Sequence, residues 1–233
     1  IICTIGPSTL NKEFLKFAKN KISLLRLNMS HLNLESMKKS IEFIKKHSKI
    51  PICIDTEGAQ IRTKVKKAQF MKYGQKFKIT NFNKDISLYP NSVYKEIKKN
   101  DILNIGFNNL KVKILNKKGC ILCKVLSPGK LENNKGVHLE NRDLQLEYLT
   151  KKDFDAIKIC KKLKIKNYAL SFTNSVRDII KFNRLLKNKN KIYKIETLKA
   201  VQNFASILKK GNFFLIDRGD LGKDIKIENI PAV

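Results

Sequence analysis

One stretch, residues 191–222, constrains the fold of this chain more than any other. Residues 192–196 alternate between apolar and polar side chains as in a strand, and residues 213–216 form an unbroken apolar run, typical of a strand buried on both faces. Between them, apolar residues recur at helical spacing up to Gly211, which ends the predicted helix. A strand–helix–strand unit of this kind predicts a parallel sheet, and therefore an α/β protein.

Charged residues follow both strands of this unit. Lys194 and Glu196 lie on one face of the first strand, and the second runs into Asp217, Arg218, Gly219 and Asp220. Functional residues of parallel barrels gather at the carboxyl ends of strands. Glu196 and Asp220 can hold Mg²⁺ through oxygen ligands, and Lys194 can stabilise charge during phosphoryl transfer. A surface ion pair beside an Arg-Gly-Asp turn fits the same spacing, so the residues alone leave both interpretations open.

The rest of the chain shows where such units repeat. Strands are predicted at residues 1–5, 23–27 and 51–54, with helices at 12–20 and 34–47, and the same alternation resumes after residue 149 with helices at 151–163 and 176–186 and a strand at 168–172. Residues 64–148 instead show short strands separated by Asn, Gly and Pro turns. We therefore predict a TIM-type (β/α)₈ barrel represented by about six βα units, in segments 1–63 and 149–233, with an inserted all-β domain at 64–148. Because a complete barrel takes roughly 250 residues, two strands are expected beyond Val233.

The composition narrows the class of protein. The formal net charge is +29 in 233 residues, but the lysines are spread along the whole chain together with abundant Asn and Ile, which favours compositional drift over an evolved nucleic-acid surface. A basic RNA-binding protein stays the alternative from another functional class. Cys120 and Cys123 form a lone C-x-x-C pair without the second pair that a zinc site needs. No apolar run is long enough to predict a transmembrane helix.

Five segments together resemble the pyruvate kinase family. They are Ile-Cys-Thr-Ile-Gly-Pro-Ser at residues 2–8, Arg-Leu-Asn-Met-Ser-His at 26–31, Asp-Thr-Glu-Gly-Ala-Gln-Ile-Arg-Thr at 55–63, and Lys-Ile-Glu at 194–196 followed by Arg-Gly-Asp-Leu-Gly at 218–222. They occur in the family's order and span the chain. The resemblance implies a glycolytic phosphotransferase that moves a phosphoryl group from phosphoenolpyruvate to ADP, giving pyruvate and ATP.

The resemblance also assigns roles to individual residues. It implies that Lys194 and Arg26 contact the transferred group, that the backbone at Gly219 and Asp220 approaches the substrate, and that Glu196 and Asp220 bind Mg²⁺ or Mn²⁺. It further implies a potassium site and a nucleotide site, formed respectively by Asn28, Ser30, Asp55 and Thr56, and by Asn28, His31, Arg62 and Lys152. Each has a simpler alternative: Asn28 and Ser30 can cap a helix, His31 can be a turn residue, and Lys152 can be an ordinary solvated lysine.

The resemblance has wider implications for the whole protein. It implies that the inserted β domain is a mobile lid, although an independent β module remains possible. It also implies a longer protein with a C-terminal domain, a homotetramer, and a location in the cytoplasm or inside an organelle.

Several positions depart from the family's pattern. Glu57 stands where the family has Lys, and Ala59-Gln60 replaces Pro-Glu. Asn104-Ile105 replaces two aspartates before Gly106, and Asp217 replaces a small residue before Arg218. The predicted metal ligands and Lys194 are present, whereas the nucleotide and lid positions have changed. Two interpretations follow: a working pyruvate kinase, or a paralogue with a changed substrate or little activity.

Overall fold

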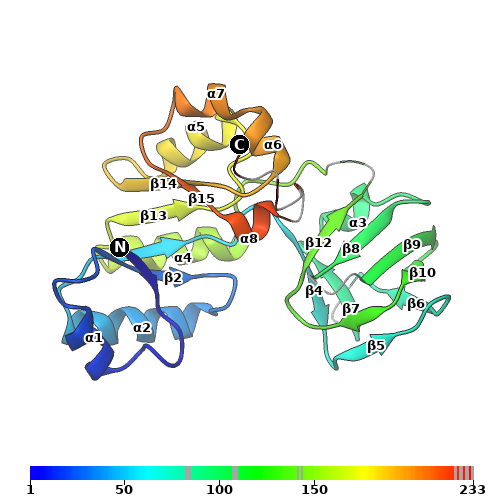
Figure 1. Cartoon of the computed structure of the whole chain (residues 1–233), viewed down its shortest axis with the longest axis horizontal. Helices are drawn as coiled ribbons and strands as arrows, with labels where there is room; N and C mark the ends of the chain where they lie inside the picture. Colours follow the sequence, from blue (N-terminus) through cyan, green and yellow to red (C-terminus); the bar gives the residue numbers. More distant parts are fainter. Residues whose placement is uncertain are drawn as a thin grey trace. The chain divides into compact units, whose positions relative to one another are not determined.

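The computed structural model describes residues 1–81, 85–106, 110–140, 142, 144–222, 225, 228 and 231. The chain divides into two compact units (Figure 1). Unit 1 comprises Ile1–Ala59 and Glu147–Val233, and unit 2 comprises Gln60–Leu146, so unit 2 is inserted into the sequence of unit 1. The boundaries expected from the sequence lie at residues 63 and 148.

Unit 1 is built on a parallel sheet flanked by helices, which confirms the α/β class (Figure 1). Its strand order is β1-β2-β3-β13-β14-β15, and every neighbouring pair is parallel. Consecutive strands are therefore neighbours, and their carboxyl ends share one edge of the sheet. The strands are β1 (Ile2–Thr4), β2 (Leu24–Asn28), β3 (Ile52–Asp55), β13 (Asn167–Leu170), β14 (Asn190–Ile195) and β15 (Phe214–Ile216).

The connecting helices begin at polar caps that the sequence provides. Asn11, Asn33 and Ser175 each accept a backbone N–H three residues ahead, which satisfies a donor that the first turn leaves open. The helices bury apolar stripes against the sheet, and Leu25, Ile41 and Phe182 belong to the resulting core. They are α1 (Lys12–Ala18), α2 (Leu34–His47), α4 (Lys151–Lys162), α5 (Val176–Leu185), α6 (Leu198–Gln202), α7 (Phe204–Leu208) and α8 (Arg218–Leu221).

Unit 2 is almost entirely β structure with a core of its own. A seven-stranded sheet has the order β6-β10-β9-β8-β12-β4-β7, with antiparallel neighbours, and β5 and β11 form a separate pair. The elements are β4 (Ile61–Val65), β5 (Gln69–Met71), β6 (Lys76–Ile79), β7 (Ile86–Tyr89), α3 (Val93–Glu96), β8 (Ile102–Ile105), β9 (Leu110–Asn116), β10 (Ile121–Ser127), β11 (Gly129–Leu131) and β12 (Gly136–Leu139). Sequence patterns located β6, β8, β9 and β10 but not the other strands.

Two expectations about the segment 191–222 were wrong. The apolar run 213–216 is not buried on both faces: Phe213 is 66% exposed and Ile216 51% exposed, because β15 ends the described sheet and has one neighbouring strand. The single helix expected between the strands is two short helices that meet at Asn203, whose side-chain amide donates to the Asn174 carbonyl. Among the described residues, no helix has the length and apolar character needed to cross a membrane.

Candidate active site

Lys194 is the centre of the candidate site. It lies on β14 with its side chain 5% exposed, and its ammonium nitrogen is 2.7 Å from Glu196 Oε1, 3.3 Å from Asp55 Oδ2 and 3.3 Å from Asp217 Oδ2. The Ser171 hydroxyl is a further neighbour at 3.4 Å. These groups come from the ends of β3, β13, β14 and β15, so the shared edge of the parallel sheet brings them together.

The charges of these groups influence one another. Burial alone lowers the pKa of Lys194, but the carboxylates of Glu196 and Asp55 outweigh it and raise that pKa. Burial raises the pKa of Glu196, although Lys194 opposes the shift. Burial also acts to raise the pKa of Asp217, but the Lys194 ammonium outweighs it and the pKa is lowered. Lys194 and Asp217 are therefore both charged at neutral pH.

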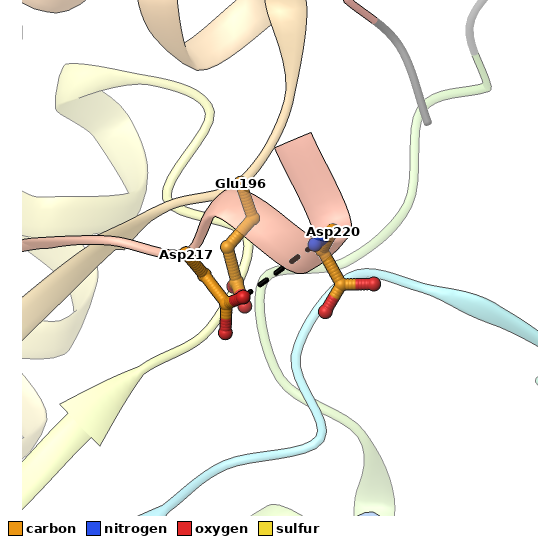
Figure 2. Close-up of side chains that lie close together, drawn as sticks. All are labelled: Glu196, Asp217 and Asp220. Atoms are coloured by element: carbon orange, nitrogen blue, oxygen red, sulfur yellow. Dashed lines mark hydrogen bonds between the residues drawn. The ribbon is translucent and has the colours of Figure 1, made fainter. Parts of the chain in front are cut away.

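Three carboxylates, two of which contact Lys194, lie close together (Figure 2). Glu196, Asp217 and Asp220 each offer an oxygen, and these oxygens lie within 4.8 Å of one another. Asp217 Oδ1 also accepts the backbone N–H of Asp220 at 3.4 Å and so caps α8. Carboxylate oxygens at this separation suit a divalent cation such as Mg²⁺ or Mn²⁺. Glu196 and Asp220 were predicted from the sequence as ligands of a divalent cation, and in the structure the Asp217 carboxylate lies with them.

The residues predicted to bind potassium lie at the ends of β2 and β3. Asn28 and Asp55 are register partners on these strands. The Asn28 side chain accepts the backbone N–H of Ser30, and the Thr56 hydroxyl accepts that of Ser171. These bonds give Asn28 and Thr56 the structural roles that turn and cap residues have. The donor set of amide, hydroxyl and carboxylate oxygens fits a monovalent cation.

Arg26 joins this group through Asp55. Its NH1 is 3.4 Å from Asp55 Oδ2, and its Nε donates to the Thr4 hydroxyl at 2.8 Å. The Arg26 side chain keeps 22% of its surface exposed, whereas that of Asp55 is 1% exposed. Asp55 thus holds two cations, Arg26 and Lys194, at neighbouring strand ends.

Two residues after β13 complete the site and were missed from the sequence. The Ser171 hydroxyl donates to Asp55 Oδ1 at 3.0 Å, and the backbone N–H of Phe172 donates to Glu196 Oε2 at 2.6 Å. Phe172 has a φ of 52°, a left-handed conformation that is uncommon for a bulky residue and is found where the surroundings fix the backbone. The sequence signal that could have identified Ser171 and Phe172 is their position at the end of a strand.

Lys152 and His31 line a separate cavity of about 600 Å³ at the beginning of α2. The Lys152 ammonium is 2.7 Å from Glu57 Oε1 and donates to the Met29 carbonyl at 2.5 Å, so it is an ion-paired group and not an ordinary solvated lysine. The Thr150 hydroxyl donates to the other Glu57 oxygen at 3.0 Å. Glu57, which stands in place of the family's Lys, is therefore neutralised by a residue of the predicted nucleotide site.

Asp153 positions the loop that carries Glu57. It is completely buried, and its carboxylate accepts the backbone N–H groups of Glu57, Gly58 and Thr150 at 2.8, 3.1 and 2.9 Å. Gly58 has a φ of +67°, and a Cβ there would lie 2.6 Å from the Ser171 carbonyl oxygen. The loop after β3 can approach Ser171 only because residue 58 has no side chain.

Arg62 and two positions that depart from the family pattern, Gln60 and Asn104, belong to unit 2. Arg62 lies on β4 and donates to the Asn134 carbonyl at 3.5 Å, within the unit. Gln60 is 6% exposed, and neither atom of its side-chain amide has a hydrogen-bond partner among the described residues. Asn104 lies on β8 opposite His138 of β12, so the residue that replaces a family aspartate faces another strand of unit 2.

Comparisons with known proteins identify the family of this chain. All 233 residues match the family model described as pyruvate kinase, barrel domain. The pyruvate kinase of Staphylococcus saprophyticus is 33% identical and that of Thermotoga maritima 30% identical, over 100% of this chain and 43% and 54% of those proteins. The crystal structure of Cryptosporidium parvum pyruvate kinase matches 99% of this chain and 54% of its own at 30% identity, with a TM-score of 0.88. This chain spans about half the length of these relatives, and it belongs to the pyruvate kinase family.

Proposed function

We propose that the protein containing this chain transfers a phosphoryl group from phosphoenolpyruvate to ADP. A terminal phosphate oxygen of ADP attacks the phosphorus, the bond between phosphorus and the enol oxygen breaks, and that oxygen takes the electron pair as pyruvate enolate. A proton then adds to the enolate carbon. The observation that carries this proposal is the buried, charged Lys194 at a meeting point of strand ends, beside carboxylates that suit a divalent cation.

Lys194 and Arg26 are the groups that would stabilise negative charge in this reaction. Lys194 stays protonated, and its fixed position costs little reorganisation when charge develops on the transferred group or the enolate oxygen. Arg26 offers a planar fork of donors to phosphoryl oxygens. Glu196 and Asp220 would hold Mg²⁺ or Mn²⁺, which neutralises phosphoryl oxygens when bound. The exposed Gly219 leaves its backbone open to close approach by the substrate.

The nucleotide and the monovalent cation have candidate positions as well. The cavity beside Ser30, His31 and Lys152 supports the nucleotide assignment for His31 and Lys152, while the parts assigned to Asn28 and Arg62 rest on the family resemblance. Asn28, Ser30, Asp55 and Thr56 would hold K⁺. The lid role of unit 2, the homotetramer and the location in cytoplasm or organelle stay predictions of that resemblance.

A paralogue with a changed substrate or slow turnover is the second candidate function. Two ion pairs favour it: Glu57 engages Lys152, and Asp217 engages Lys194. In each pair the acidic residue differs from the residue that the family has at that position. Each acidic residue neutralises a cation that would otherwise be available to an anionic ligand.

Pyruvate formation by the full-length protein tests the proposal. Purified protein is supplied with phosphoenolpyruvate, ADP and Mg²⁺, and ATP is followed by phosphorus NMR. We expect ATP and pyruvate in equal amounts, no reaction when Mg²⁺ is chelated, and faster turnover in K⁺ than in tetramethylammonium at equal ionic strength. Absence of both products from a folded, Mg²⁺-binding protein would reject phosphoenolpyruvate as the substrate and favour the paralogue.

A further inference from the structure

The carboxylate of Asp217 forms an ion pair with Lys194, the cation on which the proposed function depends. Asp217 follows β15 and reaches back to Lys194, with 3.3 Å between Oδ2 and Nζ. Its other oxygen caps α8 by accepting the Asp220 N–H. Asp217 is therefore held from two sides, by the Lys194 ammonium and by the Asp220 N–H, and Figure 2 shows the second of these contacts.

Lys194 has no hydrogen-bonding capacity left for a substrate in this arrangement. An ammonium group has three N–H donors. Four oxygens already lie within 3.4 Å of it, from Glu196, Asp55, Asp217 and Ser171. A substrate oxygen that approaches Lys194 must therefore displace one of these neighbours.

Exposure identifies which neighbour can leave. The side chains of Asp55 and Glu196 are each 1% exposed, whereas that of Asp217 is 27% exposed. Moving Asp55 or Glu196 away from Lys194 would separate a deeply buried carboxylate from a buried cation, which is strongly unfavourable. Asp217 can turn toward water, where solvation compensates for the lost ion pair.

We propose that Asp217 is a specificity-determining residue that competes with anionic substrates for Lys194. The inference rests on the proposed function, since it assumes that Lys194 meets a substrate anion. With Asp217 in place, an anionic substrate must break the Asp217–Lys194 contact and then lie beside the displaced carboxylate. A divalent cation among the Glu196, Asp217 and Asp220 carboxylates would relieve this repulsion, so the anion should bind more tightly when the metal ion is present.

Two variants remove the charge and keep the helix cap. Asp217→Asn preserves the shape of the side chain, and Asp217→Ser supplies a hydroxyl, a preferred capping group. In the full-length protein we expect both to bind phosphoenolpyruvate about tenfold more tightly than wild type at equal Mg²⁺, since removing one like-charge contact is commonly worth about 1.4 kcal/mol or more. The KM for phosphoenolpyruvate should fall accordingly, whereas Asp155→Asn on α4 should change neither value.

A second probe separates this inference from the proposed function. Binding of inorganic phosphate is measured by calorimetry with and without Mg²⁺, and it requires no turnover. Tighter phosphate binding by Asp217→Asn and Asp217→Ser, with a smaller dependence on Mg²⁺, supports the role of Asp217 even if no pyruvate forms. Unchanged phosphate and phosphoenolpyruvate affinity in both folded variants would overturn it, and a wild-type protein that makes pyruvate would then show that the proposed function alone stands.

Discussion

At the scale of single residues, the site is a balance between one buried ammonium and several carboxylates. Lys194 offsets Glu196, Asp55 and Asp217, and each of these carboxylates has a second hydrogen-bond donor elsewhere. Removing a buried charge from such a group leaves its partners uncompensated, which costs more than the pair contributed. Lys194 therefore stabilises the local structure, in addition to its proposed role in the chemistry.

Substituting Lys194 should reveal both roles. We expect Lys194→Met to reduce turnover by a factor of about 10²–10³, as for other groups that stabilise transition-state charge, and to lower the free energy of unfolding by about 3–5 kcal/mol. Lys191→Met is the matched control on the same strand, because the hydrogen bonds of Lys191 to described residues go to the backbone carbonyls of Leu186 and Lys189. Turnover is measured at saturating substrates, and stability by urea unfolding. Lys194→Met with more than half of the wild-type turnover would contradict the assignment.

Gly58 is the second position where one residue decides the site's geometry. Gly58 and Gly74 both have positive φ, but a Cβ at Gly74 meets nothing within 4 Å, whereas at Gly58 it meets the Ser171 backbone. Gly74→Ala should cost about 1–2 kcal/mol for its backbone conformation alone, and Gly58→Ala about 1–3 kcal/mol more for the clash. Urea unfolding of each variant's own unit gives the comparison. Equal losses of unfolding free energy in the two variants would show that the loop after β3 moves to accommodate the added methyl group.

At the scale of elements, hydrogen bonds to the beginning of α4 hold the loop after β3 in place. Thr150 and Asp153 form a capping box, and the same Asp153 carboxylate accepts the N–H groups of Glu57 and Gly58. One buried side chain thus serves a helix end and a loop that lie 95 to 96 residues apart in sequence. The nearby Lys152–Glu57 pair depends on this arrangement.

Loss of Asp153 should therefore cost more than loss of an ordinary cap. Asp153→Ala leaves three backbone donors without their acceptor, and we expect a loss of about 2–4 kcal/mol in unfolding free energy. Asp155→Ala, on the same helix, removes only a surface pair with Lys158 and should cost less than about 0.5 kcal/mol. Both are measured by urea unfolding. Similar losses in the two variants would mean that the loop does not need Asp153.

At the scale of the whole molecule, the chain carries two hydrophobic cores. One core, in unit 1, contains Leu25 of the parallel sheet and Ile41 and Phe182 of its helices. The other core, in unit 2, contains Leu103, Val112 and Val125. The chain enters unit 2 at Gln60 and leaves it at Leu146, so each core is formed by its own unit. Separate cores predict separate cooperative units in unfolding.

Core substitutions can test this separation. Leu103→Ala and Leu25→Ala each remove a fully buried side chain, at an expected cost of about 2–5 kcal/mol. Native-state hydrogen exchange should show faster exchange in unit 2 for the first variant and in unit 1 for the second. If either variant accelerates exchange equally in both units, the two cores unfold together.

Local sequence patterns determine some features of this protein, and tertiary packing determines others. Periodicity predicted the parallel α/β unit and most of its helices, because helix and strand spacing is local and the caps at Asn11, Asn33, Thr150 and Ser175 are encoded within one turn. It also selected Lys194, Glu196 and Asp220, because polar residues that end buried strands are visible in a sequence. The short strands β5, β7 and β11 were not found, since their pairing comes from distant segments.

Only the tertiary structure decided which of these charges contact one another. Ser171, Phe172 and Asp217 reach Lys194 or Glu196 from the adjacent strands β13 and β15, and no pattern within one strand encodes those distances. The exposure of β15 likewise depends on its place in the sheet, because an apolar run has the same sequence in a central strand and at an edge. The sequence by itself thus determined which groups stand at the strand ends, and the packing of those ends decided that Asp217 pairs with Lys194, since contacts across a sheet are set by strand order and not by sequence separation.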